Sequence, residues 1–411
     1  MYKSNKKLYY KLFDLYRHKC FINDDSESKR LNLAMLNIKN NYTLDIKSLN
    51  ENGLKSIGFD NPTISDILEF FDTQELKSFN DLVSLYPKWL SDLILSSVFE
   101  ISDLQILFNP ANNINLQDEL LLLINSDYFS HKFGIEKQYT YLRYLEFVFY
   151  DKFPINIRNN NSILDLDSNF LNDKRLYGSF HNHSLYSDGN NTIQELVNEN
   201  KRIGKFYLGI SDHSKSHFLS GGLSELDIEK QHDEINTLNA LNDDFKLFKA
   251  IECEILSDGK LDYENHTLTK FDYVIASVHT DLYQTKNEAT NRLIKAIENP
   301  YTTILGHPTG RCYKRSPGLD VDIYKVIDAC VDNNVIIEIN GDKDRLDLDI
   351  EFINYAERKG AMFSLEADAH SLFGLNSLKY AIFIAERANL NPCQCINTYS
   401  YEKVKNTLNI K

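Results

Sequence analysis

Side chains that can bind a metal recur in the second half of the chain, each at the end of a short apolar run. The runs read GSFHNH, YLGISDH, LFKAIECE, YVIASVH, TTILGHP, VIIEIN and MFSLEADAH. Six of the 11 histidines and two acidic residues stand at these ends, namely His181, His183, His213, Glu252, His279, His307, Asp368 and His370. Imidazole and carboxylate ligands without an evident thiolate suit Zn²⁺, Mn²⁺ or Fe²⁺. The pattern therefore predicts a metal centre.

The triplet His181-Asn182-His183 is the clearest part of this pattern. In a strand, residues i and i+2 point to the same side, so both imidazoles can bind one ion. Asp188 follows in the loop SLYSDG, where Gly189 permits a tight turn. With Asp188 the set has nine ligands, which is too many for one four-coordinate ion, and Glu252 can bridge two ions through its two oxygens. We therefore expect a cluster of two or three divalent ions.

The spacing of the apolar runs predicts the fold. Their ends are separated by about 30 residues, the length of one βα unit in a (β/α) barrel. Segments with helical periodicity alternate with them at 192–204, 226–242, 289–299, 322–334 and 349–360. Seven units fit, so we expect an α/β fold over residues 175–411, a distorted seven-stranded (β/α)7 barrel with its site at the carboxyl ends of the strands. The sixth run ends on Asn340, so six strands supply ligands.

Residues 1–150 are organised differently, with apolar residues at helical spacing in several short segments. These segments predict a small all-α domain, in which Thr63 and Ser78 are N-caps of two helices. An Asn-rich stretch over 151–174 with little periodicity predicts a linker between the two domains.

Composition limits the partners and the location. The net charge of −14 provides no general attraction to nucleic acid or to an anionic membrane. Six scattered cysteines predict reduced intracellular thiols, and the first residues do not have the pattern of a signal peptide. No run approaches the roughly 20 apolar residues that span a bilayer. We expect a cytoplasmic protein without a membrane partner.

A cluster of this kind also predicts the reaction class. Divalent ions lower the pKa of bound water toward about 7 and neutralise anionic oxygens. Both effects favour the hydrolysis of phosphate esters, in which a metal-activated hydroxide attacks phosphorus.

Residues 175–411 resemble a PHP (polymerase and histidinol phosphatase) domain, most of all the C-terminal PHP domain of bacterial family X DNA polymerases. The resemblance lies in HNHSLYSDGNNTIQELV, GISDHSKS, IECEIL, DYVIASVH, ENPYTTILGHPTGR, EINGDKDRLDL and DAHSLFGLNSLKYA. The family's nine metal-binding positions fall on His181, His183, Asp188, His213, Glu252, His279, His307, Asp368 and His370, and none is lost. The resemblance implies a complete trinuclear site, with Glu252, Asp368 and His183 at the centre of catalysis.

We predict a distribution of these ligands over three ions. The first ion takes His181, His183, Glu252 and Asp368. The second takes Glu252, His279 and His307, and the third takes Asp188, His213 and His370.

Charged residues near the predicted mouth are candidates for supporting roles. Arg311, Lys314 and Arg315 follow the GHPTG stretch and Arg345 follows Asn340, and guanidinium groups suit bidentate phosphate binding. Arg311 and Arg345 are the predicted catalytic contacts to phosphate. Asp212 is predicted to orient a ligand imidazole. The other histidines are expected to be ordinary polar residues: His18, His131, His217, His232 and His266.

The helical region resembles, more faintly, the N-terminal DNA-binding part of family X polymerases. A helix-hairpin-helix there would read as two glycines followed by lysines, whereas KSIGFDNP keeps only Gly58 and has Asp60 where a cation is expected. The residues between 150 and 175 leave no room for a nucleotidyl-transfer domain, so we expect no polymerase activity. We interpret the region as a degenerate DNA-binding domain that contacts a protein partner or clamps nucleic acid weakly. A folded cover packed on the barrel is an equally good interpretation.

Three functions fit these observations. The leading prediction is a phosphoesterase that acts on nucleic-acid ends in DNA repair, as a 3′→5′ exonuclease or a 3′-phosphatase. A small-molecule phosphatase of the histidinol-phosphatase type uses the same centre and fits the acidic composition. The third is a PHP subunit of a DNA-maintenance or defence complex, active only with its partner.

Overall fold

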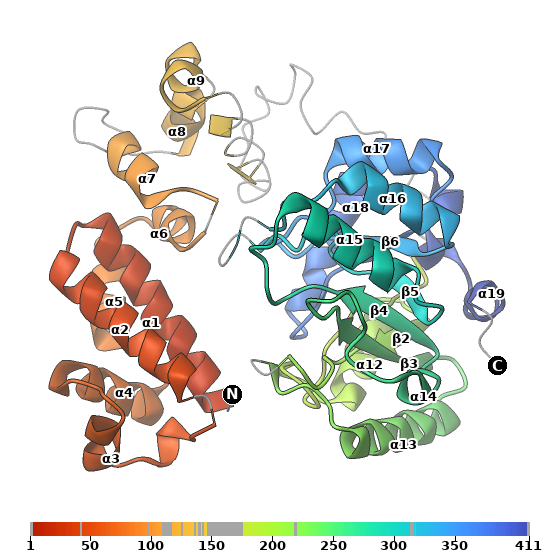
Figure 1. Ribbon diagram of the computed structural model, residues 1–411, viewed down its shortest axis with the longest axis horizontal. Helices are drawn as coiled ribbons and strands as arrows, with labels where there is room; N and C mark the ends of the chain where they lie inside the picture. Colours follow the sequence, from red (N-terminus) through yellow and green to blue (C-terminus); the bar gives the residue numbers. More distant parts are fainter. Residues whose placement is uncertain are drawn as a thin grey trace. The chain divides into compact units, whose positions relative to one another are not determined.

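The structure is a computed structural model. It describes residues 3–41, 43–96, 98–108, 117–124, 126–134, 137–138, 141, 144–145, 176–217, 220–312, 316 and 318–408. The described residues form two compact units, the first up to residue 145 and the second from residue 176 (Figure 1). The predicted linker over 151–174 lies outside the described residues, and the domain limits stay predictions. Every helix in the described part is too short or too polar to cross a lipid bilayer.

The first unit is helical throughout its described residues, as predicted. Its elements are α1 Lys3–Phe21, α2 Asp25–Asn40, η1 Ile46–Ser48, α3 Glu51–Ser56, α4 Asn61–Thr73, α5 Lys77–Val83, α6 Lys88–Leu95, α7 Ile101–Leu107, α8 Gln117–Ile124 and α9 Asp127–Phe133. Leucines of α1 and α2, among them Leu8, Leu12 and Leu31, are fully buried in its core. Helical spacing places these side chains on one face of each helix, which explains the pairing of α1 with α2.

The predicted N-caps of two helices in this unit were wrong. Helix α4 begins before Thr63, and the carboxylate of Asp60 accepts a hydrogen bond from the Thr63 backbone N–H at 2.9 Å. Pro62 stands in the first turn, where its missing N–H costs nothing, so the helix starts earlier than Thr63. Helix α5 begins at Lys77, so Ser78 lies inside it.

The second unit is built on seven parallel strands, and the prediction of a seven-stranded barrel is confirmed. The strands are β1 Gly178–Ser179, β2 Tyr207–Ile210, β3 Lys246–Glu254, β4 Tyr273–Ser277, β5 Thr302–Leu305, β6 Ile336–Asn340 and β7 Phe363–Glu366, each beside the next in chain order. The ring closes beyond the ends of β1 and β7, where Asn182 bridges to Ala369 and the His183 N–H donates to the Ala369 carbonyl at 2.9 Å. The closure is short, which makes the barrel irregular.

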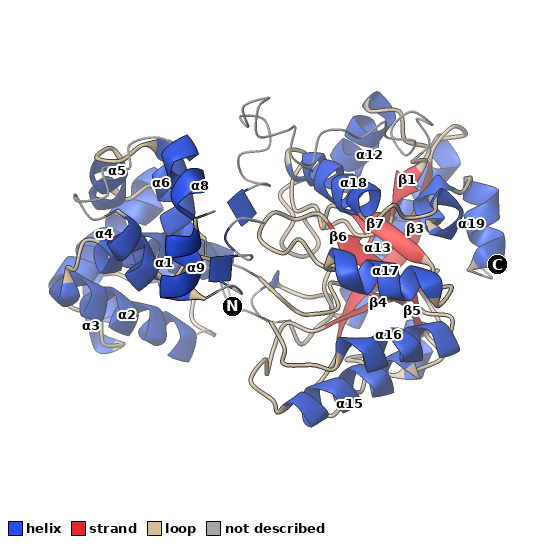
Figure 2. Cartoon of the chain, turned by 90° about the horizontal axis from the view of Figure 1, so that it is seen from above, coloured by secondary structure: helices blue, strands red, loops and turns tan. Residues whose placement is uncertain are grey.

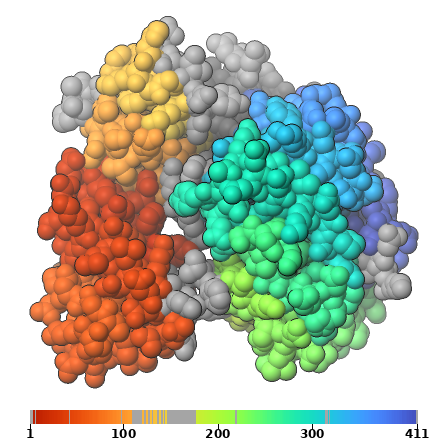
Figure 3. Space-filling view, in the orientation of Figure 1, coloured from red at the N-terminus to blue at the C-terminus, as the bar shows by residue number. Residues whose placement is uncertain are grey.

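Helices surround these strands (Figure 2). They are α12 Ile193–Arg202, α13 Glu225–Leu241, α14 Asn265–Leu268, α15 Lys286–Ile297, α16 Ile323–Asp332, α17 Ile350–Arg358, η5 Gly374–Ser377, α18 Leu378–Arg387, η6 Pro392–Gln394, η7 Ile396–Thr398 and α19 Tyr401–Thr407. In Figure 3, the teal residues of the α15 segment lie at the viewed surface of the second unit. Capping boxes at Thr192, Ser224 and Thr285 start three of the helices directly after loops from the strand ends. These caps fix where each loop ends.

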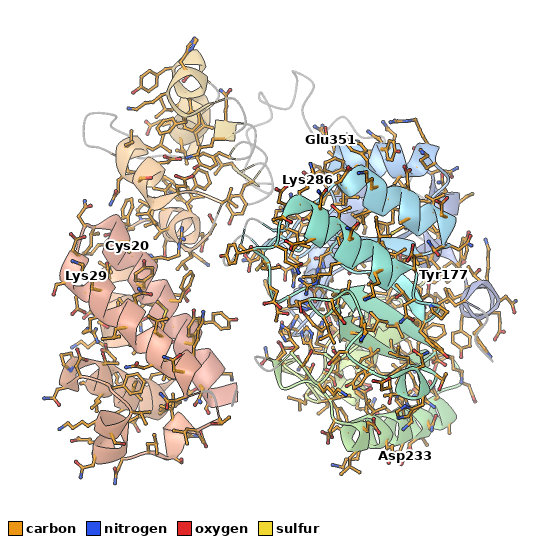
Figure 4. The ribbon with its side chains drawn as sticks, in the orientation of Figure 1. Cys20, Lys29, Tyr177, Asp233, Lys286 and Glu351 are labelled. Atoms are coloured by element: carbon orange, nitrogen blue, oxygen red, sulfur yellow. The ribbon has the colours of Figure 1, made fainter. Side chains whose placement is uncertain are left out.

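The two ends of the barrel differ in chemistry. Near the amino end, the interior is filled by Phe180, Tyr207, Phe248 and Tyr273, whose rings contact one another. The carboxyl end holds the polar side chains described below. Figure 4 labels Tyr177 at the amino end, before β1, and Lys286 and Glu351 in the first turns of α15 and α17 at the other end. The aromatic layer closes the floor of the barrel, so the polar site opens only toward the loops.

Candidate metal centre

All nine predicted ligands lie close together at the carboxyl end of the barrel. Ligand atoms of eight of them form three overlapping groups, each with all atoms within 4.8 Å of one another. The groups are His183, Asp188, His213 and His370; His181, His183 and Asp368; and His213, Glu252 and His279. His307 joins the last group through Glu252, with Nε2 at 2.9 Å from Oε1. The structure therefore brings together residues that are up to 189 positions apart in the sequence.

Glu252 occupies the middle of the cluster. Its Oε2 lies 2.8 Å from His213 Nδ1 and 3.3 Å from His181 Nε2, and its Oε1 lies 3.1 Å from His279 Nε2. Burial alone would raise the pKa of this carboxyl, but the imidazoles of His279, His181 and His213 hold it well below its usual value. Glu252 is thus an ionised carboxylate with each oxygen facing a different set of imidazoles, as a bridging ligand requires.

Asp368 connects the cluster to the surrounding protein. Its Oδ1 lies 3.1 Å from His183 Nε2, while its Oδ2 accepts hydrogen bonds from Arg345 Nε at 3.0 Å and Asn340 Nδ2 at 3.3 Å. The backbone of Asp368 has a φ of 48°, in the left-handed region that non-glycine residues seldom adopt. Such strain is retained where the surroundings fix the residue, often at functional sites. Oδ1 of Asp368 is therefore placed to bind a metal ion, while Oδ2 is held by the surrounding protein.

Asp188 and His370 form the outer edge of the cluster. Asp188 Oδ1 lies 3.3 Å from His370 Nε2 and 3.5 Å from His213 Nε2. Burial alone would lower the pKa of His370, but Asp188 foremost and then Asp368 raise it to about 9. The loop that carries Asp188 is bound to the loop after β7, because the Asn190 N–H donates to the His370 carbonyl at 2.8 Å.

The donor set fits bound cations. Several buried ligand atoms lie close to one another but form no hydrogen bond with the described residues, namely His181 Nε2, His183 Nδ1, His213 Nδ1, Glu252 Oε2 and His279 Nε2. Buried polar atoms are normally paired, and each unpaired atom costs about 1–3 kcal/mol. Unpaired nitrogens and oxygens that converge on a common space are the arrangement expected of metal ligands. The residues present therefore match multinuclear binding of divalent ions, whose number and identity stay predictions.

Two glutamates that the sequence analysis did not single out hold the ligand imidazoles in place. Glu338 Oε1 lies 2.6 Å from His181 Nδ1, and Glu254 Oε2 lies 2.7 Å from His279 Nδ1. Each contact leaves Nε2 of the same ring directed at Glu252. Strand alternation in the sequence could have indicated both glutamates, because residues two apart in a strand lie on the same face. Glu254 is two residues after Glu252, and Glu338 is two residues before Asn340.

The two arginines predicted to contact phosphate have different surroundings in the structure. Arg345 lies beside the centre through its bond to Asp368, whereas Arg311 is turned to the loop after β6. Arg311 Nε donates to the Arg345 carbonyl at 2.9 Å, and its Nη2 donates to the Leu346 carbonyl and to Asp349 Oδ1. These contacts give Arg311 a structural role and do not support the predicted phosphate contact. Lys314 and Arg315 lie outside the described residues.

Asp212 supports a loop rather than an imidazole. Its buried carboxylate accepts hydrogen bonds from the Ser184 N–H and hydroxyl, at 2.8 and 2.6 Å, and from Gln231 Nε2 at 2.7 Å. It also accepts from the Ser187 N–H at 3.1 Å. The residue therefore fixes the turn that leads from His183 to Asp188.

His217 belongs to the site, although the sequence analysis set it aside. Its ring stacks on His213 with centroids 4.4 Å apart and meets the ring of His279 edge-on at 4.5 Å. His18 and His232 are, as expected, elsewhere: His18 lies between Ser91 and the Asp14 carbonyl, and His232 packs edge-on against Phe271. Nothing in the spacing of strand ends indicates His217, because it lies in a loop four residues after a ligand.

The fold and these side chains define the class of the second unit as a (β/α)7 barrel with a candidate multinuclear metal centre. Comparison with known families identifies the family of this unit, because the PHP domain family matches residues 179–341. The chain therefore carries a PHP domain.

Known proteins support this assignment. The chain is 32% identical over 231 residues to the DNA polymerase/3′-5′ exonuclease PolX of Bacillus subtilis (strain 168), covering 56% of this chain and 40% of that protein. It is 30% identical over 176 residues to a probable phosphatase of Caldanaerobacter subterraneus subsp. tengcongensis, covering 40% of this chain and 66% of that protein. The chain thus spans less than two thirds of the length of these relatives.

One solved structure aligns with part of the chain. The histidinol phosphate phosphatase of Lactococcus lactis, in complex with zinc, L-histidinol and phosphate, aligns with a TM-score of 0.38 at 17% identity. The overlap covers 52% of this chain and 94% of that chain.

Proposed function

We propose that this chain is a metal-dependent hydrolase of phosphoric esters that acts on nucleic-acid ends through a trinuclear centre. The observation that carries the proposal is the convergence of nine ligand side chains, Glu252 at their middle, most of them buried. When bound, divalent ions would activate water and neutralise phosphoryl oxygens. The PHP domain and the phosphatases among the relatives support the same reaction class.

The protein's own side chains have separate roles in this proposal. Glu252, Asp368 and Asp188 would hold the ions with the six histidines. Glu338 and Glu254 fix the rings of His181 and His279. Arg345 keeps Asp368 oriented and places a half-buried positive charge beside the centre. Burial disfavours its charge, yet Asp368 raises the Arg345 pKa further above its usual value, so the guanidinium remains charged.

Exposed apolar side chains on the mouth loops favour a nucleic-acid substrate. Tyr283, in the loop after β4, is 90% exposed, and Phe373, in the loop after β7, is 83% exposed. Leu185, in the loop after β1, is 49% exposed. Aromatic side chains beside a backbone-binding site are stacking platforms for bases of single-stranded nucleic acid. The exonuclease among the relatives agrees with this substrate class.

A substrate panel tests the proposal. The full chain is loaded with Mn²⁺ and incubated with 3′-labelled single-stranded DNA, a 3′-phosphorylated oligonucleotide, histidinol phosphate and an aryl phosphate. We expect release of the 3′ label or the 3′ phosphate at a higher kcat/KM than for the small esters. Intact DNA alongside rapid turnover of the small esters would refute the nucleic-acid substrate and leave the reaction class standing.

A small-molecule phosphatase is the second candidate. The probable phosphatases among the relatives and the net charge of −14 favour it. A third proposal is that the helical unit binds a protein partner that activates the barrel. Light scattering of the chain with and without candidate partners, combined with the same substrate panel, tests this.

A further inference from the structure

His217 has features of a binding residue that packing does not explain. It is 6% exposed, and its ring lies against the rings of His213 and His279, which share a ligand group with Glu252. Its backbone is fixed on both sides, because its N–H donates to the Ser214 carbonyl at 3.1 Å and its carbonyl accepts from Ser220 at 3.0 Å. The ring is therefore held against the metal centre.

The imidazole of His217 has a buried atom that needs a partner. Its Nδ1 is inaccessible and makes no hydrogen bond to the described residues. A nonpolar ring such as phenylalanine would pack on the same two histidines without this cost, which is about 1–3 kcal/mol for a buried unpaired polar atom. A polar atom left unpaired beside a metal centre points to a ligand that arrives there.

Two ligands are chemically reasonable at this position, a metal ion and an anionic oxygen. The ligand atoms that lie within 4.8 Å of one another on this side are those of His213, Glu252 and His279, and His217 is not among them. An imidazole N–H is also a good donor to a phosphate oxygen, and hydrogen bonds to charged groups are the stronger ones. Because His217 lies beside this group of ligand atoms but is not part of it, an anionic oxygen is the better candidate than a metal ion.

We propose that His217 is a substrate-binding residue that donates a hydrogen bond to a phosphate oxygen held at the His213–Glu252–His279 side of the centre. This inference rests on the proposed phosphoesterase function. It assigns to His217 a role in holding phosphate that is separate from metal binding.

The experiment measures inorganic phosphate binding by calorimetry on the full chain loaded with Mn²⁺, and bound metal by elemental analysis. His217→Phe keeps a flat ring on His213 and His279 and removes both nitrogens, while His217→Asn retains a donor near the position of Nδ1. His232→Phe is the matched control, because His232 lies on α13 and packs against Phe271 outside the centre.

We expect His217→Phe to keep its metal content and to bind phosphate about 10-fold more weakly or worse, as loss of a hydrogen bond to a charged group predicts. His217→Asn should recover part of the affinity, and His232→Phe should match the wild type. Unchanged phosphate affinity in His217→Phe would show that His217 only packs against its neighbours. Loss of a bound ion would show that His217 is a metal ligand. Either result overturns the proposal. A wild-type chain that binds metal but no phosphate would instead overturn the proposed function, and this inference with it.

Discussion

At the scale of single residues, the centre depends on carboxylates that contact imidazoles on two sides. Glu252 faces five histidine nitrogens with its two oxygens. Glu338 and Glu254 contact the far nitrogens of His181 and His279. A carboxylate behind a ligand histidine selects the tautomer and strengthens the ligand. Metal affinity should therefore depend on residues that never touch an ion.

Replacing Glu338 tests this dependence. Glu338→Gln keeps the size of the side chain but replaces a charged acceptor of the His181 ring by a neutral amide, so metal affinity should fall by about 10- to 100-fold. Competition with a fluorescent chelator measures the change. Glu402→Gln, on the exposed face of α19, is the control. Equal affinity in Glu338→Gln and wild type would show that the glutamate does not support the ligand.

Replacing Asp368 tests the chemistry. Asp368→Ala removes one ligand from the group that contains His183, and it leaves the half-buried guanidinium of Arg345 without its carboxylate. Hydrolysis should fall by about 1,000-fold or more, since metal-ion stabilisation is worth several kcal/mol. The circular dichroism spectrum should remain that of the wild type. Wild-type turnover in a folded Asp368→Ala chain would exclude the proposed mechanism.

At the scale of elements, the strands and their ends were predictable and the supporting contacts were not. Six of the seven strands carry a predicted ligand near or just beyond the carboxyl end, and β6 ends on Asn340 instead. The spacing of the apolar runs therefore predicted the number of strands. Arg311 was assigned to phosphate because the sequence does not show that the loop after β6 offers it carbonyls. His217 was missed for a related reason, since a loop residue reaches the centre only through the path of its backbone.

Strand β2 depends on a close approach between its backbone and the aromatic floor. A Cβ on Gly209 would lie 1.6 Å from the hydroxyl oxygen of Tyr273 and 2.8 Å from the Phe180 carbonyl oxygen. Gly209→Ala should therefore lower the free energy of unfolding by about 1–3 kcal/mol through overpacking. Urea denaturation measures the loss, and Gly209→Ala with Tyr273→Phe should regain part of it. A fully stable single variant would contradict the described packing.

His232 on α13 provides a test of pH dependence outside the centre. Burial foremost, and then the charges of Lys249 and Lys270, lower its pKa from 6.5 to about 4. As the pH falls from 6.5 toward 4, the unfolded chain takes up a proton that the folded chain does not, so stability present above pH 6.5 is lost. Between pH 7.5 and 5, His232→Asn should lose about 1 kcal/mol less unfolding free energy than the wild type. If the unfolding free energies of the wild type and His232→Asn changed equally with pH, the lowered pKa of His232 would be contradicted.

At the scale of the whole molecule, the chain combines a PHP barrel with a helical unit of a different kind. The barrel and its chemistry were predictable because the ligands are specific in type and spacing. The substrate was not, because substrate choice depends on loop side chains such as Tyr283 and Phe373 whose exposure only the structure gives.

These two aromatic residues provide the test of substrate class. Tyr283→Ala and Phe373→Ala should each raise KM for single-stranded DNA by about 5- to 100-fold, as loss of stacking on one base predicts, and leave an aryl phosphate unaffected. Phe206→Ala is the control, because Phe206 is also exposed but precedes β2 at the opposite end of the barrel. Equal effects on both substrates would favour a small-molecule phosphatase.

The measurement that tests the central claim most directly is the number of metal ions bound per chain, obtained by elemental analysis of the purified full chain. The trinuclear centre predicts three divalent ions per chain in the wild type and fewer in His183→Ala, whose imidazole belongs to two of the ligand groups. A wild-type chain that hydrolyses phosphate esters with no bound divalent ion, or a His183→Ala chain with unchanged metal content, would contradict the account.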